Sequence, residues 1–241
     1  THSKPNLAQV PRVGNPFGKE CRECWTVEDG NVLVGIDASG IELRLLAHFM
    51  RDEDYINEIL SGDIHTKNMI AAGLTNRDQS KTFIYAFLYG AGPAKIGQIV
   101  GGGEREGRKL IDSFLKNTPS LQKLREKVSR LAQRGWLPGL DGRRLIVRSQ
   151  HAALNTLLQG SAAVVMKEAL IGLTNKMKES TIVGSFVANV HDEWQIETTK
   201  EFAGSVGEAG IQAIQQAGLT FGLRCPLDGE YKTGTNWAAT H

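Results

Sequence analysis

The sequence predicts an α+β fold in which an antiparallel sheet is interrupted by a long helical insertion. Short apolar runs rich in β-branched residues are typical of strands, and they occur at residues 32–36, 186–190 and 194–196. Almost all of residues 52–134 has helical periodicity instead. Strand-like runs on both sides of a helical block indicate that sheet and helices are segregated in the fold.

The remaining elements follow from local patterns along the chain. Residues 1–30 are rich in Pro, Gly and Asn and predict an irregular lead-in. Gly139–Gly142 predicts a turn between two short strands, with Arg143, Arg144 and Arg148 beyond it. We further expect a helix after Ser39-Gly40, a long helix over residues 150–178, a helix over 200–217 and a last strand near 223–231.

Composition excludes several classes of protein. The chain has 241 residues, of which 41% are hydrophobic, so it can bury a core and global disorder is not expected. A net charge of +2 is too small for a binder that relies on charge alone. The chain has no run of about 18 apolar residues, so we expect no membrane span.

The three cysteines favour free thiols. Cys21 and Cys24 form a C-x2-C pair, which is one half of a common zinc motif. No second pair of cysteines or histidines follows it, and Cys225 is remote. A zinc site remains the less favoured alternative.

One predicted helix carries a stripe of cations and aromatic rings, which we call the α-helical stripe. Its members are spaced four residues apart, so they lie on one slanted face: Arg77, Lys81, Tyr85 and Tyr89, followed by Gly90. A ligand with phosphates at one end and a sugar and a flat ring at the other would suit this surface. A nucleoside triphosphate has this shape. The alternative is a solvated face of long amphipathic side chains.

Two aspartates lie at strand ends on either side of the helical insertion. Asp37 ends the strand at 32–36, and Asp192 lies where a hairpin would turn between the strands at 186–190 and 194–196. Carboxylates placed in this way can share one edge of a sheet and hold Mg²⁺. Asp is also common in turns as a backbone cap, so either residue alone would be weak support.

Together these residues resemble the motifs of the family A DNA polymerases. Asp37-Ala-Ser-Gly-Ile-Glu42 looks like motif A, and Val190-His-Asp-Glu193 looks like motif C. The stripe from Arg77 to Gly90 is similar to motif B, the O helix of the fingers, and residues 151–160 resemble the palm helix between the motifs. Segments such as Gly62–Lys67 look most like the T-seven-type phage members.

The resemblance implies a catalytic role for a small set of residues. Asp37 and Asp192 would bind two Mg²⁺ ions, helped by the carbonyl of Ala38. Lys81 would bind the triphosphate and protonate the leaving pyrophosphate, and Arg77 and His65 would also bind the triphosphate.

Further roles implied by the resemblance concern selection of the nucleotide and binding of DNA. Glu42 would exclude a 2′-hydroxyl, and Tyr85 would pack on the incoming sugar and tolerate a substrate without a 3′-hydroxyl. Tyr89 would guard the position of the templating base. Residues expected at the primer-template are His191, Asn155, Gln159 and His151, of which His151 replaces the Arg of bacterial relatives.

The family also implies a domain layout and partners. We expect palm at 1–56, fingers at 57–150 with the O helix at 76–90, and palm again at 151–241, without thumb or exonuclease domains. The partners would be a DNA primer-template, dNTPs and an amino-terminal polymerase chain or segment, in the cytoplasm of a phage-infected bacterial host.

The expected function is template-directed DNA synthesis by nucleotidyl transfer with release of pyrophosphate. Two alternatives stay open. One is a non-catalytic fragment that binds DNA or a partner chain until it is assembled. The other is a metal-dependent nuclease, which the α-helical stripe disfavours because hydrolysis needs no site for a triphosphate.

Overall fold

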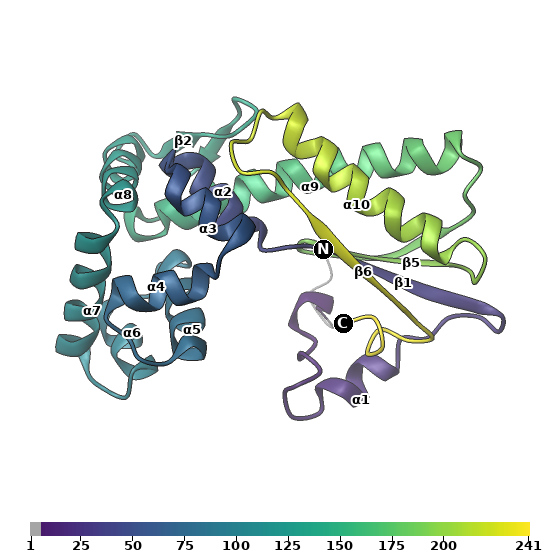
Figure 1. Cartoon of the computed structure of the whole chain (residues 1–241), viewed down its shortest axis with the longest axis horizontal. Coiled ribbons are helices and arrows are strands. Elements are labelled where there is room, and N and C mark those ends of the chain that lie inside the picture. The colour runs from purple at the N-terminus through teal and green to yellow at the C-terminus, as the bar shows by residue number, and fades with distance from the viewer. Residues whose placement is uncertain (1–5) are drawn as a thin grey trace. The chain divides into compact units, whose positions relative to one another are not determined.

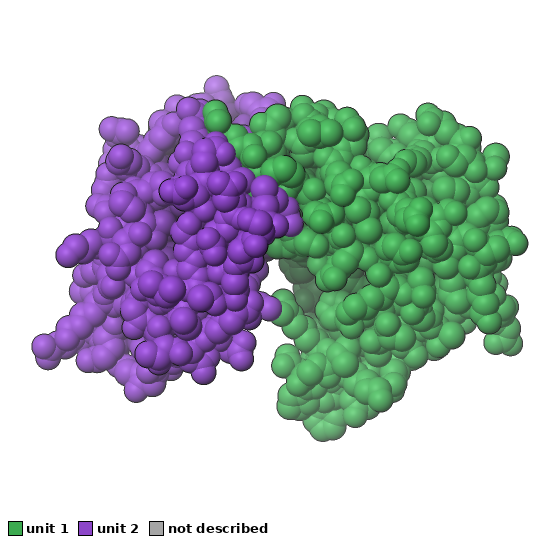
Figure 2. All heavy atoms as spheres, in the orientation of Figure 1, with its two compact units in different colours: residues 1–41, 162–241 green, residues 42–161 purple. Residues whose placement is uncertain are grey.

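The computed structural model describes residues 6–241, and their packing divides the chain into two compact units. Unit 1 consists of residues 1–41 and 162–241, and unit 2 of residues 42–161 (Figure 2). These units are defined by packing alone, so the palm and fingers boundaries given above stay a prediction.

Unit 1 is built around a four-stranded antiparallel sheet (Figure 1). The strand order is β4-β5-β1-β6, so β1 (Asn31–Ala38) is paired on both edges. Its partners are β5 (Glu193–Thr199) and β6 (Gly229–Gly234), and β4 (Ser185–Val190) pairs with β5. The predicted antiparallel sheet that carries both aspartates is therefore confirmed.

Helix α10 (Ala203–Thr220) covers one face of this sheet at very short range. Ile36 of β1 is fully buried, and a Cβ atom placed on Gly210 would lie 2.5 Å from its Cδ1 atom. A Cβ on Gly207 would overlap the ring of Tyr231 in β6 in the same way. Small residues on α10 therefore set the distance between the helix and the strand that ends at Asp37.

The amino-terminal lead-in contains a helix that the sequence did not predict. The first element is a short 3₁₀ helix, η1 (Leu7–Gln9). Helix α1 (Gly18–Glu23) follows it and is held in place by long-range contacts of Arg22. The Nε atom of Arg22 donates to the Pro11 carbonyl at 2.9 Å, and its guanidinium lies 4.2 Å from the ring centre of Trp237. These partners are remote in sequence, so no local sequence pattern predicts the helix.

The last strand also differs from its prediction. Residues 223–228 are irregular, and β6 begins only at Gly229. Pro226 lacks the N–H group that a strand would use, and Cys225 and Leu227 are buried without forming a ladder. These buried apolar residues do not form a strand, so the prediction of a strand over residues 223–228 is wrong.

Unit 2 is mostly helical, as predicted. Its core includes three aromatic rings, since Phe114 lies edge-on to Phe83 and Phe87 with centroids 5.2 and 5.6 Å away. The helices are α2 (Ile41–Met50), α3 (Glu53–Ser61), α4 (Ile64–Ala72), α5 (Arg77–Leu88), α6 (Pro93–Ile99), α7 (Glu104–Asn117) and α8 (Pro119–Ala132).

The predicted turn at Gly139–Gly142 does join two short strands, β2 (Trp136–Pro138) and β3 (Arg144–Ile146). The short turn η2 (Gln150–Ala152) leads into the long helix α9 (Ala153–Glu179). Among the described residues, Gln150–Glu179 is long and apolar enough to cross a membrane, but half of its apolar window is buried inside the structure. Core helices have the same property, so this is weak support for a span.

The close packing of α10 predicts different effects for two Gly→Ala changes on the same helix. Gly210→Ala should lower the free energy of unfolding by about 1–3 kcal/mol, because its Cβ would overlap Ile36. Gly204→Ala has open space around it and should leave stability unchanged or raise it by up to about 1 kcal/mol. Chemical denaturation measures both, and equal effects would contradict this account of the packing.

Candidate active site

Asp37 and Asp192 lie next to each other where the two central strands of the unit 1 sheet, β1 and β5, meet at one end. Asp37 is directly opposite Glu193 in the β1–β5 ladder, and Asp192 precedes Glu193 in the turn between β4 and β5. The amide of Ala38 donates to the Asp192 carbonyl at 3.1 Å, which ties the turn to the end of β1. Both aspartates are partly exposed.

The turn itself is a tight two-residue connection. His191 is exposed and has a φ angle of 56°, in the left-handed region that non-glycine residues seldom adopt. That conformation brings the chain back into β5 immediately after Asp192. The local backbone thus fixes where His191 and Asp192 stand relative to the sheet.

Glu193 supports the site from a buried position. Its Oε1 atom accepts from Trp237 Nε1 at 2.7 Å and from Gln195 Nε2, and its Oε2 atom lies 3.3 Å from His241 Nδ1. Burial alone would raise the pKa of Glu193, but the hydrogen bonds from these partners lower it below its usual value. The carboxylate is therefore held in its charged form next to Asp192.

The donor set at this edge fits Mg²⁺. Asp37, Asp192 and the carbonyl of Ala38 offer only oxygen ligands, which hard divalent cations prefer. In the described part of the chain, no group of three or more His, Cys, Asp or Glu side chains is placed to hold a metal. Two carboxylates suit Mg²⁺, which usually takes one or two of them and completes its shell with waters and substrate phosphates. It gives no support to zinc at the exposed thiols Cys21 and Cys24.

In unit 2, the α-helical stripe is the outward face of α5. Arg77, Lys81 and Tyr89 are exposed and Tyr85 is half-buried, with the rings of Tyr85 and Tyr89 6.3 Å apart. The adjoining face of the helix consists of buried apolar side chains: Phe83, Ile84, Phe87 and Leu88. Burial of that face fixes the rotation of α5 and leaves the cations and tyrosines accessible.

Arg77 is held by a residue whose part in the site was not predicted. Asp63 caps α4 by accepting from the amides of His65 and Thr66, as expected for an N-cap. The same carboxylate accepts from Arg77 Nε at 2.7 Å and from its Nη2 atom at 3.1 Å. The hydrogen bond from Arg77 holds the pKa of Asp63 well below its usual range. The ion pair joins residues 14 positions apart, so no local pattern in the sequence predicts it.

His65 lies on α4 beside the stripe. Its ring centroid is 6.3 Å from that of Tyr85, and its Nδ1 atom is buried with no hydrogen-bond partner among the described protein atoms. Burial, followed by the nearby charges of Lys81 and Arg77, lowers the pKa of His65. The imidazole is thus a neutral group with an unused polar atom close to two cations.

Glu42, Tyr89 and Gln159 form one hydrogen-bonded cluster. The Oε1 atom of Glu42 accepts from the Tyr89 hydroxyl at 3.0 Å and from Gln159 Nε2 at 3.3 Å. These residues come from α2, the end of α5 and α9. Three positions predicted separately are therefore brought together, and the carboxylate of Glu42 is fixed by two donors.

Gly90 ends α5 for two physical reasons. Its φ angle is 82°, and the bonds from Gly90 N to Phe87 O and from Ala91 N to Ala86 O form a Schellman motif. A Cβ at Gly90 would also lie 2.9 Å from the carbonyl oxygen of His151. The glycine thus allows His151 to approach the end of the stripe. On α9, the Oδ1 atom of Asn155 is buried and has no described partner.

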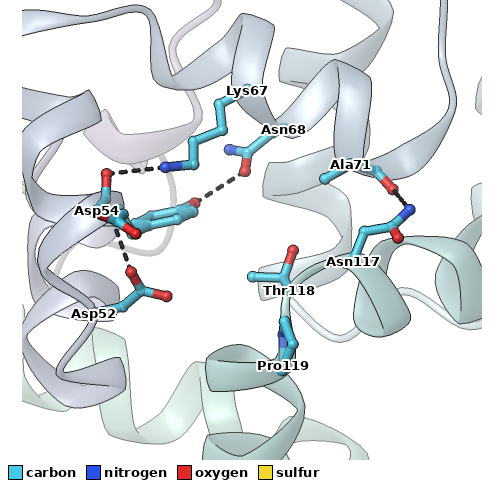
Figure 3. Close-up of a pocket in the computed structure, with 9 residues that line it drawn as sticks. Asp52, Asp54, Lys67, Asn68, Ala71, Asn117, Thr118 and Pro119 are labelled. Carbon is cyan, nitrogen blue, oxygen red and sulfur yellow. Dashed lines mark hydrogen bonds between the residues drawn. The ribbon is translucent and has the colours of Figure 1, made fainter.

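A cavity of about 210 Å³ lies elsewhere in unit 2, and none of the predicted site residues lines it (Figure 3). It is lined by α3, α4 and the junction of α7 with α8. Tyr55 donates to Asn68 Oδ1 at 3.1 Å in its wall, and Asn117 Nδ2 donates to the Ala71 carbonyl at 2.9 Å. These bonds join neighbouring helices, so the cavity wall is part of the scaffold.

Comparison with known proteins gives a consistent result. The family model for DNA polymerase family A matches residues 1–239. The DNA-directed DNA polymerases of Escherichia phage T7 and Enterobacteria phage T3 are 46% and 44% identical over the whole chain. The chain spans 39% of the length of each of these two relatives.

A solved structure shares the fold. The POL domain of Pol1 from M. smegmatis, in complex with DNA primer-template and dNTP, superposes with a TM-score of 0.86 at 24% identity. The match covers 98% of this chain and 45% of that one. With the family model matched over almost its entire length, this chain belongs to the family A DNA polymerases.

Proposed function

We propose that this chain carries the nucleotidyl-transfer site of a template-directed DNA polymerase. The observation that carries the proposal is the β1–β5 register, which brings Asp37 and Asp192 to one edge of the sheet. Family membership supports it, and so do two phage DNA-directed DNA polymerases that are 44–46% identical along the whole chain.

In the proposed reaction the primer 3′-oxygen attacks the α-phosphate of a dNTP, and pyrophosphate leaves. Family A polymerases are metal-dependent, and two Mg²⁺ ions would activate the attacking oxygen and stabilise the leaving one. Asp37, Asp192 and the Ala38 carbonyl would hold these ions. Lys81, an exposed cation on the stripe, would donate a proton to the departing pyrophosphate.

The remaining polar groups of α4 and α5 would bind the triphosphate. Arg77 would exchange part of its ion pair with Asp63 for phosphate oxygens, because its fork of donors suits either partner. The buried Nδ1 atom of His65 and the charge of Lys81 lie on the same side of unit 2. Tyr85 would pack against the sugar.

Glu42 would select deoxynucleotides by occupying the space of a 2′-hydroxyl. Its two hydrogen bonds support this role, since a carboxylate fixed by Tyr89 and Gln159 cannot easily move aside. Tyr89 would also guard the position of the templating base.

Four residues would contact the primer-template. His191 would touch the primer terminus from the exposed turn before Asp192. Asn155 and Gln159, on α9, would read minor-groove acceptors that all correct base pairs share, and His151 would lie near them. The M. smegmatis structure, which holds DNA primer-template and dNTP, supports these ligands.

We also propose that other parts of a longer or assembled protein complete the enzyme. The phage relatives are more than twice as long as this chain, which leaves room for the thumb and an exonuclease domain. An amino-terminal chain or segment would supply them. The site of action would be the cytoplasm of a phage-infected bacterium.

Replacing one metal ligand tests the proposed reaction. Asp192→Asn should lower the rate of primer extension by roughly 10³-fold, because it removes a charged ligand of the Mg²⁺ ions that would stabilise the developing negative charge at the reacting phosphate. Extension with dNTPs and Mg²⁺ should be measured in the longest form of the protein that contains this chain.

The control is Asp29→Asn, which makes the same change at the exposed turn before β1 and should extend primers normally. Full extension by the Asp192 variant would contradict the proposal. Degradation of DNA without dNTPs, lost in the same variant, would favour the nuclease instead.

Glu42→Ala should weaken discrimination against ribonucleotides by roughly 10- to 100-fold, since it opens space for a 2′-hydroxyl. The measurement is the ratio of kcat/KM for a dNTP and the matching rNTP. Tyr89→Phe removes one of the two bonds that fix Glu42 and should give a smaller change in the same direction. Glu53→Ala, on the exposed surface of α3, is the matched control. Unchanged discrimination in the Glu42 variant would remove it from this role.

A further inference from the structure

The β2–β3 hairpin of unit 2 has two different faces. In its ladder Leu137 is directly opposite Leu145, so these two side chains share one face. Leu137 is 1% exposed, and a Cβ on Gly160 of α9 would lie 2.9 Å from both Leu145 methyls. This face is therefore buried against the helix, and the other face of the hairpin is left accessible.

The outer face carries stacked arginines. Trp136 is opposite Ile146, which is 68% exposed, and Arg144 is opposite Pro138, so these residues share that face. The guanidinium carbon of Arg134 lies 3.6 Å from the Trp136 ring centre, and that of Arg144 lies 4.8 Å away. We call Arg134, Trp136 and Arg144 the hairpin patch.

The stacking holds the two guanidinium groups in place while leaving donors unused. Arg134 is fixed further by a bond from its Nε atom to the Trp136 carbonyl at 3.2 Å, which leaves both of its Nη atoms available. A cation held on an aromatic face loses less side-chain entropy when it binds a ligand. The patch is thus preorganised for a partner that accepts hydrogen bonds from flat guanidinium groups.

No salt bridge within residues 6–241 neutralises the charge of the patch. In the described residues, neither Arg134 nor Arg144 has a carboxylate oxygen within 4.0 Å. The neighbouring Arg143 differs, since its Nε atom pairs with Asp141 Oδ2 at 2.6 Å. The two stacked arginines therefore keep their full charge for an external anion.

We propose that the hairpin patch binds the sugar-phosphate backbone of DNA, independently of base sequence. Phosphate oxygens match the bidentate donor geometry of guanidinium groups, and exposed arginines beside an aromatic ring are typical of nucleic-acid surfaces. The choice of DNA as the partner rests on the proposed polymerase function. The patch is formed by residues separate from those assigned above to the nucleotide, the metal and the primer-template.

The test is equilibrium binding of a fluorescein-labelled single-stranded DNA of mixed sequence, by anisotropy, without dNTPs and with EDTA present. The double variant Arg134→Ala/Arg144→Ala should bind at least about tenfold more weakly at low salt, because two charge-assisted bonds are lost. The slope of log K against log salt should become shallower by about 1.4, the value for two phosphate contacts on single strands. Trp136→Ala should weaken binding in the same direction by releasing both arginines, with circular dichroism checking its fold.

The double variant Arg105→Ala/Lys109→Ala removes two positive charges from the exposed surface of α7 and is the matched control. Unchanged binding by the patch double variant, or an equal loss in the α7 control, would overturn the proposal. The assay needs no catalysis, so its outcome is separate from that of primer extension. Weaker binding by the patch variants alongside a wild type that extends no primer would refute the polymerase function and leave the patch standing.

Discussion

The pairing of β1 with β5 is the constraint on which the candidate active site depends. It sets Asp37 opposite Glu193 and joins Ala38 to the Asp192 carbonyl. A shift of one residue in this register would turn every side chain of β1 to the other face of the sheet. Burial of Ile36 against Gly210 prevents such a shift, because the alternative would bring Asp37 against the apolar surface of α10. Packing on the other face of β1 thus determines where the carboxylates lie.

In unit 2, packing also determines which side chains are accessible, and there the element is a helix. The buried aromatic cluster fixes the rotation of α5, and the stripe is what remains on its outer face. Further contacts then hold individual side chains, as Asp63 holds Arg77 and as Tyr89 and Gln159 hold Glu42. Arg77 and Glu42 are therefore positioned by hydrogen-bond partners as well as by their helices. Preorganisation of this kind is what charge stabilisation in a transition state requires.

Local patterns predicted most of the elements, and long-range contacts account for the failures. Periodicity was sufficient for β1, α5 and the long helix α9, because each buries a regular set of apolar positions. Helix α1 depends on Arg22 reaching Trp237, which no window of sequence contains. The ion pair of Arg77 with Asp63 and the stacking of two arginines on Trp136 were missed for the same reason. Motif spacing identified candidate site residues, and the structure adds which of them touch.

The central claim is that Asp37 and Asp192 hold metal together at the edge of the sheet. Titration of the protein with Mn²⁺, followed by electron paramagnetic resonance in the presence of a dNTP, tests it most directly. The account predicts that Asp37→Asn and Asp192→Asn each weaken binding by at least about tenfold, the loss expected for one charged ligand. Asp29→Asn should bind Mn²⁺ like the wild type. Wild-type affinity in both Asp37 and Asp192 variants would contradict the claim.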